Sequence, residues 1–245
     1  MLNIVIPMAG AGSRFADAGY LDPKPLIEVK GIPMIQLVIR NLIPKVEHRF
    51  IFVVQKRHYH EYKLEQLIGE VTNDSKFVLV DGITQGAACT VLEAIDYIDN
   101  EDPLMIANSD QYLDFEIDDY LDQEPNSSDG LIMTMHASGD KWSYLNVDEN
   151  GYVSEVAEKR EISNIATTGI YNFAKGSTFV LGANAMIAND ERVNGEFYVA
   201  PVYNYLISRG YRIRHHLIGD CGKAMYGLGT PEDLGYFLKH FGVEG

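Results

Sequence analysis

LNIVIPMAGAGSRFADAGYLDPKPLIEVKG, residues 2–31, is the stretch that decides the fold. Residues 2–6 are apolar and rich in β-branched side chains, and Pro7 follows them, which is the pattern of a strand buried on both faces of a parallel sheet. The carboxyl end of such a strand lies at the edge where open α/β sheets bind their ligands. Gly10 and Gly12 come next, and without side chains they let backbone N–H groups approach a polyphosphate. The sequence therefore predicts a phosphate-binding loop directly after the first strand.

Two familiar phosphate-binding loops do not match this stretch. A P-loop requires Gly-Lys followed by Ser or Thr, which occurs nowhere in the chain, and a Rossmann fingerprint requires a small residue where Phe15 stands. The loop instead reads G-x-G-S-R-F, and ten residues after Arg14 comes Lys24 within Pro-Lys-Pro-Leu. The bland alternative is a turn with surface cations. The order of strand, glycine loop, arginine and Pro-Lys-Pro resembles the nucleoside-triphosphate-binding signature of the sugar-phosphate nucleotidyltransferases, also called nucleotide-sugar pyrophosphorylases.

This resemblance spans nearly the whole chain and implies a fold and a set of site residues. The implied fold is a Rossmann-like, three-layer α/β/α nucleotidyltransferase fold, similar to GT-A, with a mixed, mostly parallel central sheet and an antiparallel acceptor-binding portion. We expect a single domain over residues 1–245, with a nucleotide-binding half (1–124) and an acceptor-binding half (125–245). The catalytic residues implied are Arg14 and Lys24. The nucleotide-binding residues are expected to be Met8, Ala9, Gly10, Ala11, Gly12, Ser13, Gln85, Gly86, Asn108 and Ser109.

Composition limits the partners. The 245 residues are 46% hydrophobic, enough for a substantial core, and no apolar run is long enough for a membrane span. Neither a signal peptide nor a disulfide framework is indicated, so we expect a cytoplasmic protein without a membrane partner. A net charge of −15 disfavours nucleic acid as a partner. In so acidic a chain, the cluster of Arg14, Lys24 and Lys30 near the glycine loop is all the more informative.

The first half alternates strands and helices. Strands are predicted over residues 2–6, 49–54, 77–80 and 104–107, and helices over 33–45, 59–68, 115–123 and through 91–95. The strand ends would converge on one edge of the sheet.

Two of these strands end in candidate ligand contacts. After the third, the family resemblance makes Gln85 and Gly86 candidates for the nucleobase platform, because one amide can read the edge of a base; the alternative is a helix-capping turn. After the fourth, Asp110 matches the family's aspartate and stands where Mg²⁺ would be held, although a lone Asp in a turn is often only a cap.

The second half carries several strands close together. Strands over 130–136, 144–148, 152–156 and 167–173 read as largely antiparallel, and helices over 176–188 and 199–207, a strand over 211–217 and a terminal helix from Pro231 follow. Residues 125–128 form the best boundary between the halves. By resemblance, the phosphorylated acceptor binds here. The acceptor-binding candidates are Trp142, Ser143, Glu158, Lys159, Thr168, Gly169 and Glu196.

Some of these assignments have simpler alternatives, and one position departs from the family. Lys159 could be a surface lysine, and Trp142 a core anchor rather than a stacking surface. Thymidylyl- and uridylyltransferases of the family usually carry a metal-binding Asp two residues before the Gly-Thr of the last helix, where this chain has Gly227. Asp220 is acidic and near in sequence, so it is our candidate for that role; otherwise the second metal contact is missing.

The resemblance implies a Mg²⁺-dependent enzyme that transfers a nucleotidyl group from an NTP (CTP, UTP or dTTP) to a sugar phosphate or another phosphorylated metabolite, releasing pyrophosphate. Similar relatives serve capsule or surface-polysaccharide pathways. Two alternatives stay open: a GT-A glycosyltransferase that uses a nucleotide sugar, and a regulatory domain that binds a nucleotide sugar without turnover. The base, the acceptor and assembly into a homo-oligomer are not decided by the sequence.

Overall fold

The computed structural model describes residues 1–123 and 128–241. Four parallel strands form one side of its main sheet, in the order β6-β1-β4-β5. Their bounds are β1 Leu2–Pro7, β4 His48–Gln55, β5 Ser75–Val80 and β6 Leu104–Ala107. The four strands predicted in the first half are confirmed, and because they are parallel their carboxyl ends lie at one edge of the sheet. Of the predicted boundary residues 125–128, only Ser128 is among the described residues.

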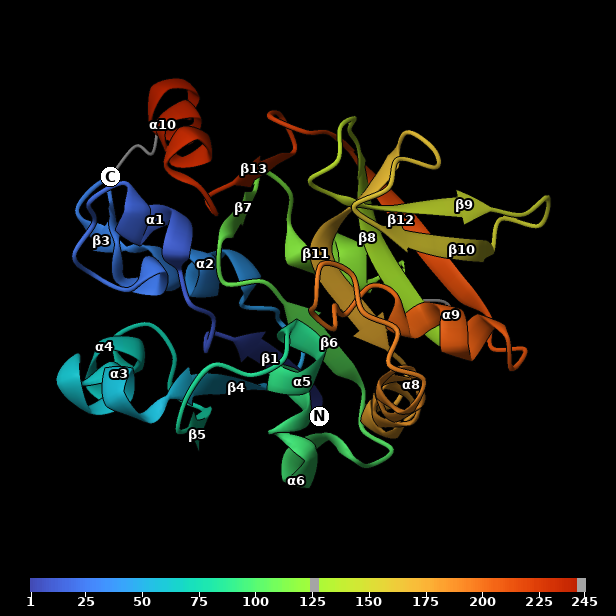
Figure 1. Cartoon of the computed structure of the whole chain (residues 1–245), viewed down its shortest axis with the longest axis horizontal. Coiled ribbons are helices and arrows are strands. Elements are labelled where there is room, and N and C mark those ends of the chain that lie inside the picture. The colour runs from blue at the N-terminus through green and yellow to red at the C-terminus, as the bar shows by residue number, and fades with distance from the viewer. Residues whose placement is uncertain (124–127, 242–245) are drawn as a thin grey trace.

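The second half of the chain extends this sheet with mainly antiparallel strands. β11 (Ile165–Phe173) pairs with β6 and continues to β9 (Ser143–Val147) and β10 (Val153–Glu158). β8 (Gly130–His136) pairs antiparallel with β11, and β12 (Ile213–Asp220) runs parallel to β8. Nine strands of the described part of the chain therefore share one sheet, and the two halves of the chain lie side by side along it (Figure 1).

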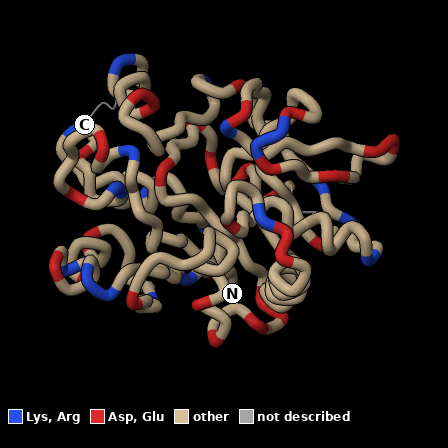
Figure 2. The backbone as a smooth tube through the Cα atoms, viewed as in Figure 1, with Lys and Arg blue, Asp and Glu red and all other residues tan. Residues whose placement is uncertain are grey.

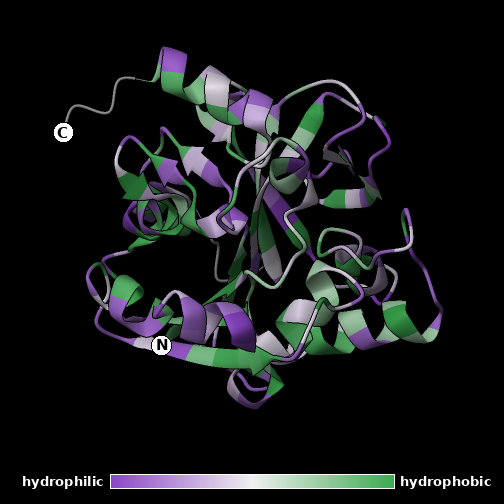
Figure 3. Ribbon diagram, turned by 60° about the vertical axis from the view of Figure 1, so that its left-hand side comes forward, coloured by the Kyte–Doolittle hydropathy of each residue, from purple (hydrophilic) through white to green (hydrophobic). Residues whose placement is uncertain are grey.

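Helices cover both faces of the sheet, because the strands are apolar on both sides. In β1, Ile4 and Ile6 belong to one core cluster and Val5 to the other. The first cluster is closed by α2 (Met34–Leu42), α4 (Leu64–Gly69), α7 (Ile117–Leu121) and α10 (Pro231–His240); the second by α5 (Ala87–Leu92), α6 (Ile95–Ile98), α8 (Gly176–Ala188) and α9 (Val202–Ile207). Hydrophobic colour runs through the inner strands in Figure 3, with hydrophilic stretches on the outer helices and loops. This is the predicted three-layer arrangement.

Some element boundaries differ from the prediction. The helix expected over 59–68 is two helices, α3 (Lys56–Glu61) and α4, because Lys63 between them has a left-handed backbone with φ 49°. The helix expected through 91–95 is divided into α5 and α6. Periodicity also missed two small pairs, β2 (Glu28–Val29) with β3 (Ile32–Pro33), and β7 (Gln111–Leu113) with β13 (Met225–Gly227). Two or three residues are too few to show a period.

The last helix returns to the first half of the chain. In Figure 1, α10 lies beside the N-terminal elements α1 (Ser13–Asp17) and β3. The Tyr112 ring packs against Phe237 and Phe241, and the ammonium of Lys30 donates to the carbonyl of Phe241 at 2.7 Å. Acidic residues lie all around the outline of the molecule in Figure 2, with Lys and Arg among them. Within the described part of the chain, every helix is too short or too polar to cross a bilayer.

Candidate active site

The glycine loop takes its shape from the end of β1. Gly12 has φ 61° and caps α1, and a Cβ built on it would lie 3.5 Å from the Cβ of Lys24. Lys24 begins the short 3₁₀ helix η1 (Lys24–Leu26), which Pro23 precedes. The amide of Gln55, at the end of β4, donates to the carbonyl of Ala9 at 3.0 Å and ties the loop to the neighbouring strand. The loop and the Pro-Lys-Pro segment therefore lie against each other.

Two cavities meet at this edge of the sheet. The first, which residues 10–12 line, is called the glycine-loop cavity and has a volume of about 460 Å³. The second, which residues 167–169 of β11 line, is called the β11 cavity and has a volume of about 380 Å³. Of the predicted nucleotide-binding residues, those lining the glycine-loop cavity are Met8, Gly10, Ala11, Gly12, Gly86, Asn108 and Ser109. The β11 cavity is lined by Arg14 and by all seven predicted acceptor residues, Trp142, Ser143, Glu158, Lys159, Thr168, Gly169 and Glu196. The structure thus separates most of the two predicted sets into two adjoining spaces.

The wall between the cavities is shared. Six residues line both: Lys24, Ala87, Asn108, Asp110, Glu196 and Tyr198. At its centre the ammonium of Lys24 donates to Oδ2 of Asp110 at 2.7 Å, and each side chain is about one quarter exposed. A cation and a carboxylate far apart in the sequence are therefore paired where ligands in the two cavities would come together.

Three predicted nucleotide contacts line neither cavity. Gln85 is exposed, and its Oε1 accepts a hydrogen bond from Arg192 at 2.6 Å. Ala9 is buried in the core, and Ser13 starts α1. The part of the 82–86 loop that does reach the glycine-loop cavity includes Gly86, whose φ of 129° no residue with a side chain adopts readily.

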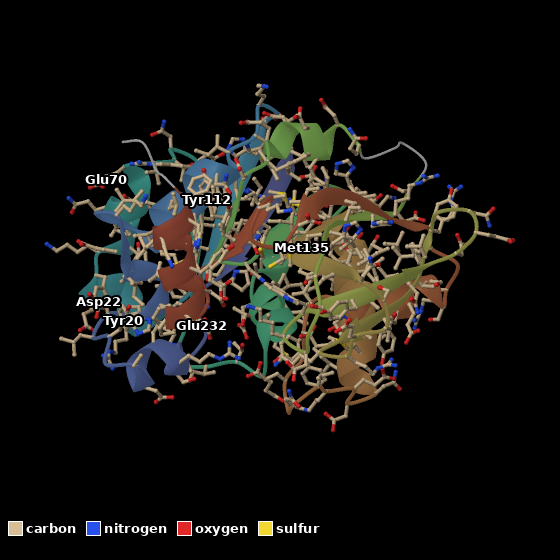
Figure 4. The ribbon with its side chains drawn as sticks, turned by 90° about the horizontal axis from the view of Figure 1, so that it is seen from above. Tyr20, Asp22, Glu70, Tyr112, Met135 and Glu232 are labelled. Atoms are coloured by element: carbon tan, nitrogen blue, oxygen red, sulfur yellow. The ribbon has the colours of Figure 1, made fainter. Side chains whose placement is uncertain are left out.

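The mouth of the glycine-loop cavity includes a segment to which the sequence pattern assigned no role. Tyr20, Leu21 and Asp22 line it, and the Leu21 side chain is 96% exposed. Figure 4 shows Tyr20 and Asp22 close together on the N-terminal side of the molecule, in the connection between α1 and η1. No periodicity or charge pattern distinguishes this connection from an ordinary loop.

Two adjacent charged residues, Glu158 and Lys159, line the β11 cavity, and each is hydrogen-bonded to a hydroxyl group. The Ser143 hydroxyl donates to the Glu158 carboxylate, and burial raises the pKa of Glu158 above its ordinary value despite this bond and the nearby Lys159. The ammonium of Lys159 donates to the Tyr198 hydroxyl and lies 4.6 Å from the centre of that ring. Glu158 is the last residue of β10, and Lys159 follows it with a left-handed φ of 53°, which breaks the alternation of side chains along the strand and lets both residues reach one cavity.

The pKa shift of Glu158 predicts how stability depends on pH. A carboxyl group whose pKa is higher in the folded state than in the unfolded state holds its proton longer when folded, so stability falls as pH rises from the unfolded to the folded pKa. Glu158→Gln removes this ionisation. We expect the thermal unfolding temperature of the variant, measured by calorimetry, to rise relative to that of the wild type as the pH increases from about 4.3, the ordinary pKa of a glutamate. A difference that stays constant above this pH would contradict the shift.

The metal site predicted from two aspartates is only partly assembled. Asp110 lies in the wall of both cavities, but Asp220 lines neither and instead pairs with Lys223 at 3.0 Å and with His136 at 3.4 Å. Among the described residues no three His, Cys, Asp or Glu side chains gather as a metal site. Mg²⁺ commonly uses one or two protein carboxylates and completes its shell with substrate phosphates and water. Asp110 beside a phosphate-sized cavity fits that kind of site, without Asp220.

The structure adds residues that the sequence reasoning did not single out. Tyr198 lies in the shared wall, two positions after the predicted Glu196. Lys141 and Asp233 line the β11 cavity and pair at 2.8 Å, and Oδ2 of Asp233 is 3.5 Å from where a Cβ on Gly227 would be. The match at Glu196 could have drawn attention to Tyr198. Lys141 and Asp233 are 92 residues apart, so no local pattern relates them.

Comparison with known proteins identifies the family to which this fold belongs. The family model for nucleotidyl transferases matches residues 4–198, so the chain belongs to this family. The bifunctional protein GlmU of Methanocaldococcus jannaschii is 25% identical over 177 residues, 71% of this chain but 40% of that protein. This chain therefore covers well under half of that relative. UTP–glucose-1-phosphate uridylyltransferase AglF of Haloferax volcanii is 25% identical over 222 residues, 86% of each protein.

Solved structures show the same fold. A nucleoside-diphosphate-sugar pyrophosphorylase from Vibrio cholerae RC9 superposes with a TM-score of 0.80 at 27% identity, covering 96% of this chain and 99% of that one. The inositol-1-phosphate CTP transferase from T. maritima has a TM-score of 0.75 at 16% identity over 96% of this chain and 94% of the other. The predicted fold class is confirmed, as is the resemblance to the nucleotidyltransferases.

Proposed function

We propose that the protein transfers a nucleotidyl group from a pyrimidine nucleoside triphosphate to a phosphorylated small molecule and releases pyrophosphate. The observation that carries this proposal is the wall shared by the two cavities, with Lys24 and Asp110 in it. A triphosphate in the glycine-loop cavity and an acceptor phosphate in the β11 cavity would meet there. Two of the proteins described above are named as a glucose-1-phosphate uridylyltransferase and an inositol-1-phosphate CTP transferase, which supports hydroxyl-bearing phosphates as the acceptor class.

The reaction joins two anions, so positive charge and alignment are what the protein must supply. An oxygen of the acceptor phosphate attacks the α-phosphorus, a new P–O bond forms, and the bond from the α-phosphorus to the bridging oxygen breaks as pyrophosphate leaves with the electron pair. Backbone N–H groups of residues 10–12 would hold the triphosphate. Lys24 would leave Asp110 for the α-phosphate, and Lys159 would attract the acceptor phosphate into the β11 cavity, where Arg14 would add a second positive charge.

A bound Mg²⁺, held by Asp110, would neutralise charge on the phosphates. Under this proposal the first half of the chain would mainly hold the nucleotide and the second half the acceptor, although Arg14 lines the β11 cavity and Glu196 and Tyr198 line both cavities. Under this proposal the enzyme supplies activated sugars or alcohols, as capsule and surface-polysaccharide pathways require.

A matrix of nucleotides and acceptors tests the proposal. The protein is incubated with Mg²⁺ and CTP, UTP or dTTP, each with glucose 1-phosphate, inositol 1-phosphate and a wider set of phosphorylated metabolites, and pyrophosphate release is measured. Release that requires both substrates supports the proposal. Hydrolysis of a nucleotide sugar without pyrophosphate release would favour a glycosyltransferase, and nucleotide-sugar binding seen by calorimetry without any turnover would favour a regulatory domain.

Asp110→Asn tests the metal assignment. The variant keeps the size of the side chain but loses the charge that would attract Mg²⁺, so we expect a higher Mg²⁺ concentration for half-maximal turnover. Binding of Mn²⁺ in the presence of nucleotide, followed by electron paramagnetic resonance, should weaken in parallel. Asp220→Asn is the control, because Asp220 lines neither cavity and should leave both titrations unchanged. If the Mg²⁺ dependence of turnover is unaltered in Asp110→Asn, the metal assignment is wrong and Asp110 has only a structural role.

A further inference from the structure

Three lysines line the β11 cavity, and two of them are neutralised. Lys24 pairs with Asp110 at 2.7 Å, and Lys141 pairs with Asp233 at 2.8 Å. Within residues 1–123 and 128–241, Lys159 forms an ion pair with no carboxylate. The charge of Lys159 still acts on the neighbouring Glu158, whose pKa it lowers, but no carboxylate oxygen of the described residues lies within ion-pair distance of its ammonium.

Tyr198 takes the place of that missing partner. Its hydroxyl accepts from the ammonium of Lys159, and its ring lies 4.6 Å from the same nitrogen, a distance at which a ring face attracts a cation. Burial raises the pKa of the Tyr198 phenol above its ordinary value, so the hydroxyl is uncharged at pH 7. Tyr198 therefore restrains Lys159 without cancelling its charge.

The backbone at both ends of this contact is restrained too. Lys159 follows the last residue of β10 with a left-handed φ of 53°, and its N–H donates to the carbonyl of Trp142 at 2.9 Å. On the other side, the N–H of Phe197 donates to the carbonyl of Gln85 at 2.9 Å, which ties the residue before Tyr198 to the 82–86 loop. The contact thus joins β10 to the loop that lines the glycine-loop cavity.

We propose that Tyr198, in the wall shared by the two cavities, is a positioning residue that holds the ammonium of Lys159 in the β11 cavity without neutralising it. This inference rests on the proposed function, in which Lys159 attracts the acceptor phosphate. A free lysine has four rotatable side-chain bonds and loses their freedom when it binds a phosphate. A carboxylate could hold it equally well but would compete with the phosphate for its charge. A neutral phenol avoids that competition.

The first measurement distinguishes the contribution of the Tyr198 hydroxyl from that of its ring. Tyr198→Phe keeps the ring face and loses the hydrogen bond, and Tyr198→Leu loses both. With glucose 1-phosphate as the acceptor probe, or whichever phosphate in the matrix releases pyrophosphate fastest, we expect the acceptor KM to rise a few-fold for the first variant and at least tenfold for the second. The KM for the nucleotide should change less than the KM for the acceptor in both.

A double-mutant cycle then asks whether Tyr198 acts through Lys159. Lys159→Met raises the acceptor KM by itself; in that background Tyr198→Leu should add no further increase. Additive effects would overturn the inference, because they would show that the tyrosine acts independently of the lysine. An unchanged acceptor KM in Tyr198→Leu would overturn it as well.

A matched control and a check on the proposed function complete the design. Tyr152 holds Arg214 in the same way, with the guanidinium carbon 4.7 Å from the ring centre, but lines neither cavity, so Tyr152→Leu should leave the acceptor KM unchanged. If the wild type releases no pyrophosphate with any acceptor, the proposed function fails and this inference falls with it. If the wild type turns over and the cycle is additive, only the role of Tyr198 fails.

Discussion

Lys24→Ala should reduce turnover by about a hundredfold or more while leaving the fold intact, by analogy with the loss of one charge-stabilising donor in other active sites. Lys24 is one of the six residues in the wall shared by the cavities, and its ammonium is already ordered by Asp110 at 2.7 Å. Its removal leaves the Asp110 carboxylate facing incoming phosphates without a cation between them. The measurement is kcat for pyrophosphate release, with thermal unfolding as a check on folding.

Lys223→Ala is the matched control for this prediction. Lys223 pairs with Asp220 at 3.0 Å, so the same type of ion pair is broken, but neither residue lines a cavity. Exposed pairs of this kind contribute little to stability, because solvent screens them. The control should retain wild-type turnover. Full activity in Lys24→Ala would refute the role of this lysine, and equal losses in the two variants would point to a general charge effect.

Gly86→Ala should have the largest effect on stability. Gly86 has φ 129° and ψ 174°, a region that only glycine occupies readily, and an added Cβ would lie 2.5 Å from both the backbone N and the backbone O of Phe197. The backbone of residues 85–88 is hydrogen-bonded to the backbone of Phe197 through Gln85 and Ala88, and these two segments would have to separate. We expect a loss of about 3 kcal/mol or more in the free energy of unfolding, measured by urea titration.

Gly82→Ala is the control in the same loop. A Cβ on Gly82 would have no atom within 4 Å, so its stability should stay close to that of the wild type. Nucleotide binding by the Gly86→Ala protein, measured by calorimetry below its unfolding temperature, should also weaken because Gly86 lines the glycine-loop cavity. Wild-type stability in Gly86→Ala would show that this loop and residues 196–198 are not packed as described.

The sequence predicted the layers of the fold because local pattern determines them. Apolar runs such as residues 2–6 must be buried on both faces, and the alternation of strand and helix then implies a parallel sheet. The same reasoning could not predict β7 and β13, because their pairing joins Gln111 to Gly227 and depends on where the chain returns after more than a hundred residues. Short elements of that kind are set by tertiary contacts.

The candidate site likewise has features that local sequence indicates and features that depend on tertiary contacts. Gly12 and Lys24, which belong to contiguous motifs, lie against each other, and the seven residues predicted to bind the acceptor line one cavity. Gln85 was chosen from the family resemblance, and its side chain accepts a hydrogen bond from Arg192. Asp220 was chosen by residue type and proximity in sequence, and it pairs with Lys223. A sequence pattern names a side chain but does not show which of several nearby charges it will meet.

The return of the C-terminal segment to the first half bears on how the protein is made. The backbone carbonyl of Asp110 accepts from the N–H of Leu228 at 2.7 Å, and a Cβ on Gly229 would lie 2.6 Å from Oδ2 of Asp110. A ribosome delivers residues 1–123 long before residues 225–230. The nascent chain can therefore form its parallel strands early, but the surroundings of Asp110 are completed only when the last helix has emerged and docked. A protein truncated before residue 225 should keep much of its secondary structure and lack a finished catalytic centre.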